Sequence, residues 1–70
     1  MTRPIEVVIY REDDQWVAQA LNVDVSSFGA SPEDARAAIV EALELYFEDA
    51  ENTEVPEVAE TRIEHIELHA

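Results

Sequence analysis

The apolar positions of this 70-residue chain follow two periods, one of two residues and one of about 3.6 residues. Residues 5–11 alternate and are rich in β-branched side chains, which predicts a strand. A polar turn at residues 12–15 and a second apolar run at 16–21 predict an antiparallel hairpin. After a loop at residues 22–24, the pattern of residues 25–30 predicts a third strand.

A helix is predicted from Ser31 to Asp49, where the period changes to that of a helix. Ser31 is a favourable N-cap, and Pro32 suits the first turn. Gly29 is the single glycine of the chain and stands just before this cap, so we expect a close backbone approach or an unusual dihedral angle there.

The apolar stripe of this helix is wider than the roughly 100° that one buried face requires. Its continuous part consists of Leu45, Ala38, Ala42, Ala35, Tyr46, Ile39, Ala50 and Leu43, and Phe47 and Val40 extend it. The extra flank is predicted to meet another subunit or a partner. We expect this contact to be made by Val40, Leu43 and Phe47 of the helix and by Trp16 of the hairpin, since buried aromatic residues usually dominate interface energies.

The end of the chain is predicted to return to the sheet. Residues 51–60 are acidic and contain Pro56, which favours an extended, poorly ordered connection. Residues 62–68 (RIEHIEL) favour a strand, with a helix as the alternative. The chain is thus predicted to be a single domain, residues 1–70, with a two-layer α+β fold of order β-β-β-α-β, in which one long helix packs on an antiparallel sheet. The second face of the sheet is left uncovered, which predicts a homo-oligomer, either a dimer or a tetramer.

Charge and composition restrict the classes of function. The formal net charge is -13 and lysine is absent, which disfavours direct binding to nucleic acid and suits a basic protein partner. A general adaptation to solubility or to a saline cytosol explains the acidity equally well. No cysteine is present to form a disulfide, and no apolar run is long enough for a signal peptide or a membrane span. We therefore expect a cytoplasmic protein.

Three clusters carry side chains that are suited to chemistry, and each has a simpler structural explanation. The acidic cluster is typical of a solvated turn, and the histidine cluster is typical of a half-exposed strand. In the serine cluster, Ser31 is explained as a helix cap. The sequence therefore predicts no catalytic residue, no metal site, no cofactor and no enzymatic activity. The three clusters are Glu12, Asp13 and Asp14; His65, Glu67 and His69; and Ser26, Ser27 and Ser31.

Three segments together resemble the HicB family of antitoxins: EDDQWVAQAL in the hairpin, SSFGASPEDA before the helix, and ARAAIVEALELYFED within it. The resemblance covers roughly residues 5–50. It implies a degenerate RNase H-like domain without nuclease activity, which binds and neutralises a small basic HicA-like toxin, an mRNA interferase of a type II toxin-antitoxin system. Charge and exposed loop position predict that Glu12, Asp13, Asp14 and Asp24 contact such a toxin.

Longer members of the HicB family carry a C-terminal DNA-binding domain, whereas this sequence stops at Ala70, after the last predicted strand. We therefore do not expect this chain to repress its own promoter without a second protein. The alternative interpretation is an orphan oligomeric HicB-like module that has no toxin and whose ligand is unknown.

Overall fold

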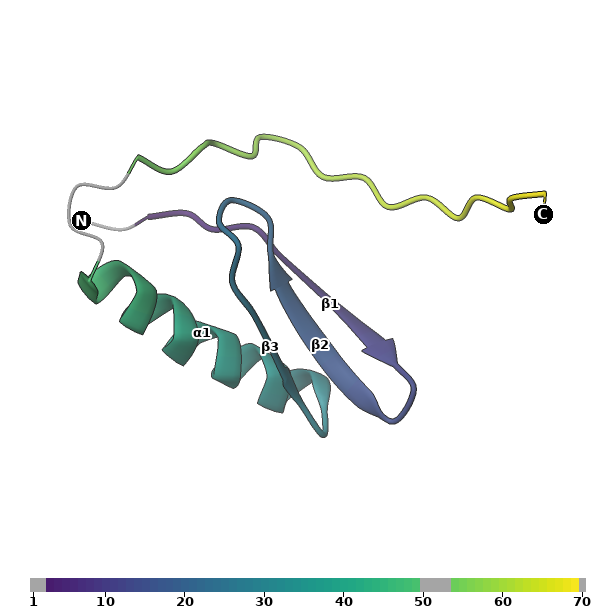
Figure 1. Ribbon diagram of the computed structural model, residues 1–70, viewed down its shortest axis with the longest axis horizontal. Coiled ribbons are helices and arrows are strands. Elements are labelled where there is room, and N and C mark those ends of the chain that lie inside the picture. Colours follow the sequence, from purple (N-terminus) through teal and green to yellow (C-terminus); the bar gives the residue numbers. More distant parts are fainter. Residues whose placement is uncertain (1–2, 50–53, 70) are drawn as a thin grey trace.

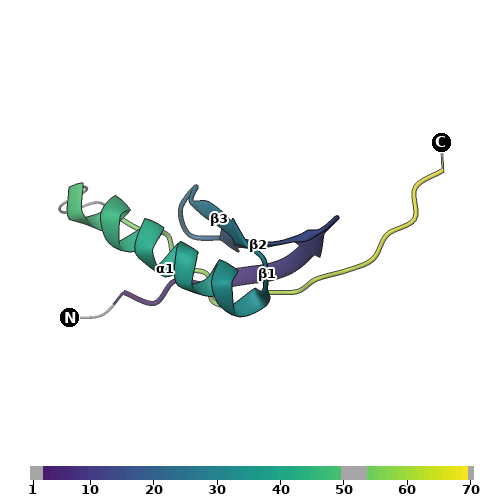
Figure 2. The ribbon, with the colours of Figure 1, turned by 90° about the horizontal axis from the view of Figure 1, so that it is seen from below.

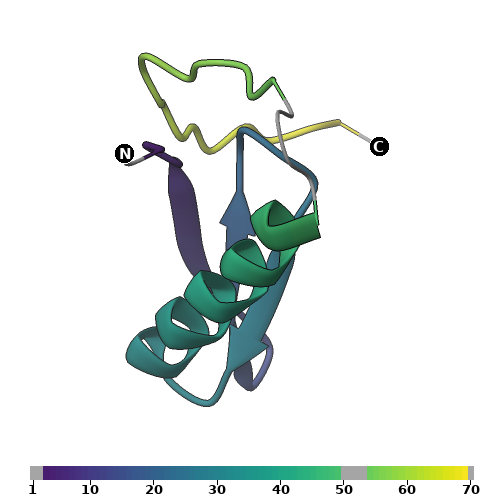
Figure 3. The ribbon, with the colours of Figure 1, turned by 90° about the vertical axis from the view of Figure 1, so that its left-hand side faces the viewer.

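The computed structural model describes residues 3–49 and 54–69 of the chain. Three strands form one antiparallel sheet in the order β1-β2-β3, and one helix lies across one face of it (Figures 1 and 3). The predicted small α+β fold, with an antiparallel sheet and a single long helix, is confirmed in these residues. The elements are β1 (Val7–Glu12), β2 (Gln15–Ala20), β3 (Ser26–Gly29) and α1 (Pro32–Asp49).

The predicted returning strand at Arg62–Leu68 is wrong. Residues 54–69, which we call the arm, are extended but pair with no strand of the sheet, so the described residues give the order β-β-β-α (Figure 1). The alternation of side chains defines the two faces of an extended segment but does not supply the edge that completes a strand. Of the predicted acidic connection, residues 54–60 belong to the arm, and residues 51–53 lie outside the described residues, as does Ala50 of the predicted helix stripe.

The core lies between β2 and α1 and consists of small residues and one large one. Ala18 and Ala20 of β2 and Ala35 and Ile39 of α1 are all at least 97% buried, with exposures of 0%, 3%, 0% and 1%. Alanine at the contact lets the helix approach the sheet closely, because no long side chain separates the two backbones. Half-buried residues surround this cluster: Ile5, Val7, Ile9, Trp16, Val23, Val25 and Leu43.

The start of α1 is fixed by its cap and by direct contact with β3. The backbone N–H of Asp34 donates to Ser31 Oγ over 3.1 Å, and that of Ala35 donates to the Ser31 carbonyl oxygen over 2.9 Å, which confirms the predicted cap. A Cβ atom placed on Gly29 would lie 2.7 Å from the Ala35 nitrogen and 2.7 Å from Asp34 Cβ. Glycine is therefore required here by close approach and not by a positive φ, which it does not have.

Gly29→Ala should lower the free energy of unfolding by about 2 to 3 kcal/mol, since the added methyl group overlaps backbone that cannot rotate away. Urea denaturation of this variant and of Ser26→Ala, an exposed position on the same strand, provides the comparison. Equal stability of Gly29→Ala and the unmodified protein would show that α1 can shift away from β3 at little cost.

The turn between β1 and β2 contains one strained residue. Asp13 has a φ of 56°, in the left-handed region that aspartate tolerates better than most residues. Its neighbour Asp14 has no positive φ, although it carries the same charge and lies in the same turn.

Asp13→Gly should raise the free energy of unfolding by about 1 kcal/mol by removing the Cβ strain at positive φ. Asp14→Gly removes the same charge but should leave stability unchanged or lower it by about 0.5 kcal/mol, because glycine loses more backbone entropy on folding. Thermal unfolding of the two variants separates the effect of strain from that of charge. An equal gain in stability for both variants would show that the gain comes from the lost charge and not from the relief of strain.

Candidate protein-binding site

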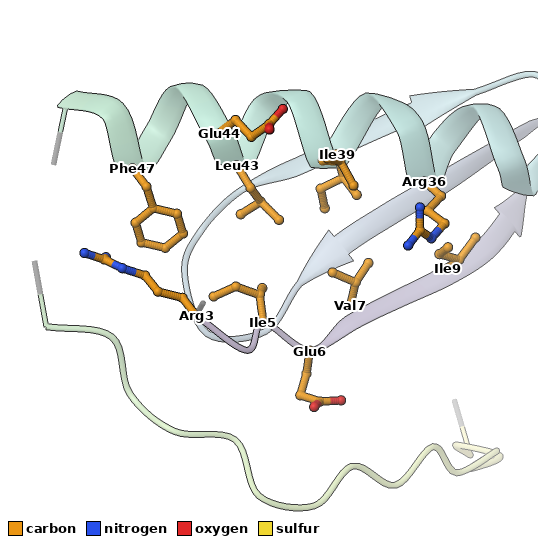
Figure 4. A pocket seen from close by; sticks show the side chains of 11 residues that line it. Arg3, Ile5, Glu6, Val7, Ile9, Arg36, Ile39, Leu43, Glu44 and Phe47 are labelled. Atoms are coloured by element: carbon orange, nitrogen blue, oxygen red, sulfur yellow. The ribbon is translucent and has the colours of Figure 1, made fainter. Parts of the chain in front are cut away.

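A groove with a volume of about 730 Å³ runs between β1 and α1 (Figure 4). One side is formed by Ile5 and by the residues of β1 that face the helix, and the other by one flank of α1. Because the side chains along its length are mostly apolar, the groove suits a binding site for an apolar segment. The apolar lining residues are Ile5, Val7, Ile9, Ile39, Val40, Leu43 and Phe47.

Three of the four residues predicted for an oligomer or partner interface lie together in this groove: Val40, Leu43 and Phe47. Val40 is 41% exposed, so part of its surface is open to solvent. Trp16 is not among the lining residues and packs, half-buried, against the core on the helix-facing side of β2. The part of each residue in an interface stays a prediction.

Cationic side chains lie along the groove in this strongly acidic chain. The Arg3 guanidinium lies 4.6 Å from the centroid of the Phe47 ring, a cation–π distance, and Tyr46 meets the same ring edge-on at 5.1 Å. Arg36 is the second arginine in the lining, with Glu6 and Glu44 as the acidic members. Two of the chain's four cations therefore border one apolar groove, a surface that favours an occupant with both apolar and acidic groups.

The outer edge of β1 adjoins this groove. Val8, Tyr10 and Glu12 face Gln19, Val17 and Gln15 across the β1–β2 ladder. The hydrogen bond from the Leu21 N–H to the Glu6 carbonyl oxygen shows that even-numbered residues of this segment bond towards β2. By the alternation of antiparallel ladders, the N–H and C=O groups of Val7, Ile9 and Arg11 point outward, and in the described residues no strand pairs with them.

Asn22 connects the beginning of the arm to the sheet. The side chain is buried, with 8% exposure, and its Oδ1 accepts a hydrogen bond from the Glu6 N–H over 2.9 Å. Its Nδ2 donates to the Pro56 carbonyl oxygen over 2.7 Å. Val55 and Val58, on either side of this contact, are half-buried, whereas every described residue after Val58 is exposed. The arm is therefore held at its start and leaves the sheet from there.

Asn22→Ala should lower the free energy of unfolding by about 1 to 2 kcal/mol, because it removes two partly buried hydrogen bonds to the backbone of Glu6 and Pro56. Asn22→Asp keeps an acceptor for the Glu6 N–H but places a carboxylate opposite the Pro56 carbonyl oxygen. We therefore expect backbone order parameters from ¹⁵N relaxation to fall for residues 55–58 in both variants, with the Glu6 amide staying ordered only in Asn22→Asp. Unchanged order at 55–58 would show that this hydrogen bond does not hold the arm.

The sheet face opposite α1 carries a row of three apolar residues. Tyr10 faces Val17, and Val17 faces Phe28, across all three strands. Phe28 is 65% exposed and Tyr10 is 41% exposed. This row lies on the sheet face that the sequence predicted to be uncovered. Phe28 is not among the residues predicted for an interface. The alternation of residues within β3 indicates which face Phe28 occupies, but the row itself depends on the register of three strands.

The residues predicted for toxin contact occupy two separate places. Glu12, Asp13 and Asp14 lie together at the β1–β2 turn, whereas Asp24 lies in the β2–β3 loop at the opposite end of the sheet (Figure 1). All four are exposed, as is every other acidic side chain whose burial is described. The acidic surface is therefore spread over the molecule, and the part of these four residues in a toxin contact stays a prediction.

The histidine and serine clusters have ordinary structural surroundings. His65 Nε2 lies 3.6 Å from Glu67 Oε1 on the exposed arm. Ser31 caps α1, and Ser26 and Ser27 belong to β3. Within residues 3–49 and 54–69, no three His, Cys, Asp or Glu side chains gather in a way that would hold a metal ion. None of the helical segments in these ranges combines the length and apolar character needed to cross a bilayer.

Comparisons of the chain with models of protein families, with curated proteins and with solved structures found no match.

Proposed function

We propose that this chain is a cytoplasmic, non-catalytic, antitoxin-like protein that binds and neutralises a small basic toxin, an mRNA interferase. The observation that carries the proposal is the exposure of every acidic side chain whose burial is described. Of these, only Glu64 has an arginine partner in the described residues, through the Arg62–Glu64 ion pair of 2.7 Å. The remaining carboxylates act on the surroundings as a largely uncompensated negative field, which steers a basic protein towards the surface.

The resemblance of residues 5–50 to HicB antitoxins, in a degenerate RNase H-like domain, supports the same function. The β1–β2 turn is the part of the surface that we assign to the toxin, because three acidic residues adjoin there at one exposed end of the sheet. We further propose that the protein works as a homo-oligomer, a dimer or a tetramer, since the groove and the open sheet face both leave apolar surface exposed.

The direct test is co-purification with the product of the adjacent small reading frame, at low and at high salt. We expect a stoichiometric complex whose dissociation constant rises with salt, because screening weakens the attraction between exposed charges. The double variant Asp13→Asn/Asp14→Asn should raise that constant by about tenfold at low salt, as expected for the loss of two exposed charge contacts.

The matched control is Glu41→Gln/Glu48→Gln, which removes two charges from exposed positions on α1. A smaller effect of this pair would place the contact at the β1–β2 turn, and an equal effect would attribute binding to net charge alone. Recovery of a homo-oligomer with no complex at either salt concentration would contradict the antitoxin proposal and favour the orphan module.

A further inference from the structure

We propose that the arm of one copy binds as a fourth strand along the β1 edge of a second copy, and that the exchange is reciprocal. Residues 62–68 form the added strand, and Ile66 and Leu68 fill the groove between β1 and α1. The inference rests on the homo-oligomer part of the proposed function and is independent of the toxin. It specifies a closed, two-fold dimer in which each copy both donates an arm and receives one.

The β1 edge offers what strand addition requires. The outward N–H and C=O groups of Val7, Ile9 and Arg11 form an unpaired ladder, and an extended segment placed there gains main-chain hydrogen bonds. The side chains of Val7 and Ile9 lie in the adjacent groove, with Leu43 on the helix side (Figure 4). Alternate side chains of an added strand therefore reach apolar surface on the helix-facing side of the sheet.

The arm already has the conformation of the strand that would be added. The Arg62 guanidinium and the Glu64 carboxylate pair at 2.7 Å, which places them on one side of the arm, and His65 and Glu67 approach one another on the other side. Ile66 and Leu68 share the side of Glu64 by the alternation of an extended chain. Ile66 is 70% exposed and Leu68 is 88% exposed, so their apolar surface is open to solvent.

Charge does not oppose the arm as the occupant of this groove. Arg3 and Arg36 line the groove with Glu6 and Glu44, and on the side of the arm that carries Ile66 and Leu68 the Glu64 carboxylate is paired with Arg62. An arm that enters the groove therefore brings one carboxylate, together with its own arginine, towards two of the four cations of the other copy. In a chain with a net charge of -13, this is a place where the repulsion of a second copy is reduced.

The arm does not occupy the groove of its own chain. Asn22 holds it at Pro56, and from there its described residues pass the sheet and end beyond it (Figures 1 and 2). No arm residue lines the groove of its own chain. The radius of gyration is 13.8 Å, whereas a compact domain of this length has about 11 Å. Exchange between copies buries both the arms and the grooves without changing the fold of either body.

Sedimentation equilibrium and disulfide cross-linking together test the exchange. Ile66→Asp and Leu68→Asp should each raise the dimer dissociation constant by about 100-fold or more, because each dimer loses two buried apolar side chains. Both positions are exposed within one copy, so these variants should keep the unfolding transition of the monomer. Phe28→Ser on the open sheet face is the matched control and should leave the dimer intact.

Cross-linking distinguishes an arm that binds the groove of a second copy from an arm that folds back into the groove of its own chain. The chain has no cysteine, so every disulfide comes from the introduced residues. Mixing Ile66→Cys with tagged Val7→Cys or Ile9→Cys should give a disulfide between different chains in at least one of the two mixtures. The double variants Ile66→Cys/Val7→Cys and Ile66→Cys/Ile9→Cys, at concentrations where the protein is monomeric, should not close an internal disulfide. An internal disulfide in the monomer would overturn exchange in favour of folding back.

The remaining outcomes separate exchange from the proposed function. A dimer that survives Ile66→Asp and Leu68→Asp but is lost in Phe28→Ser overturns the exchange and leaves the homo-oligomer in place. A monomer at all concentrations overturns both the exchange and the homo-oligomer, without affecting the toxin complex. Exchange between two acidic chains should strengthen as salt rises, opposite to the expected behaviour of the toxin complex, because screening reduces like-charge repulsion.

Discussion

The direct contact between the first turn of α1 and β3 at Gly29 determines how the rest of the molecule is arranged. With no side chain at this position, the helix backbone rests on the strand, and only two residues separate the end of β3 from Pro32. The helix is therefore fixed over β3 and continues above the alanines of β2, which allow close packing. β1 is the strand farthest from this contact in the sheet order, and its large apolar residues face a groove. The groove is a consequence of where the single helix is anchored.

Local patterns were sufficient to predict the hairpin, the third strand and the helix. The capping serine, the alternation in residues 5–11 and the change of period at Ser31 all act within a few residues of the structure they specify. The third strand is shorter than predicted, at Ser26–Gly29, although the Val25 carbonyl oxygen still accepts a hydrogen bond from the Ala20 N–H over 2.9 Å. The wide stripe of α1 also had a physical meaning: Val40 and Phe47, which exceed one buried face, lie along the groove.

Features that depend on distant pairing were not predictable. Asn22 forms hydrogen bonds to the backbone of Glu6 and Pro56, which are 16 and 34 residues away in the sequence. The residues next to Asn22 in the sequence therefore do not indicate that its side chain is buried or which groups it connects. The row through Tyr10, Val17 and Phe28 requires the register of three strands. For the arm, alternation correctly predicted extended backbone but wrongly predicted a strand in the same sheet. A strand is defined by its partner edge as much as by its own sequence, and the pattern within one segment does not name that edge.

Charge and apolar surface have different consequences for association in this chain. The exposed carboxylates are spread over both ends of the sheet, the helix and the arm. Their electrostatic field therefore affects the rate of association and the charge of the partners that are attracted. Much of the exposed apolar surface lies in a groove, on a sheet face and on the arm, where shape determines which segments fit, and Leu21 and Leu45 are exposed outside these places. Two copies of so acidic a chain repel one another at long range, and the proposed exchange would gain its contacts only where apolar segments meet. A basic partner would be attracted from a distance and would need no such fit to begin binding, so the two proposed associations would have opposite dependence on salt.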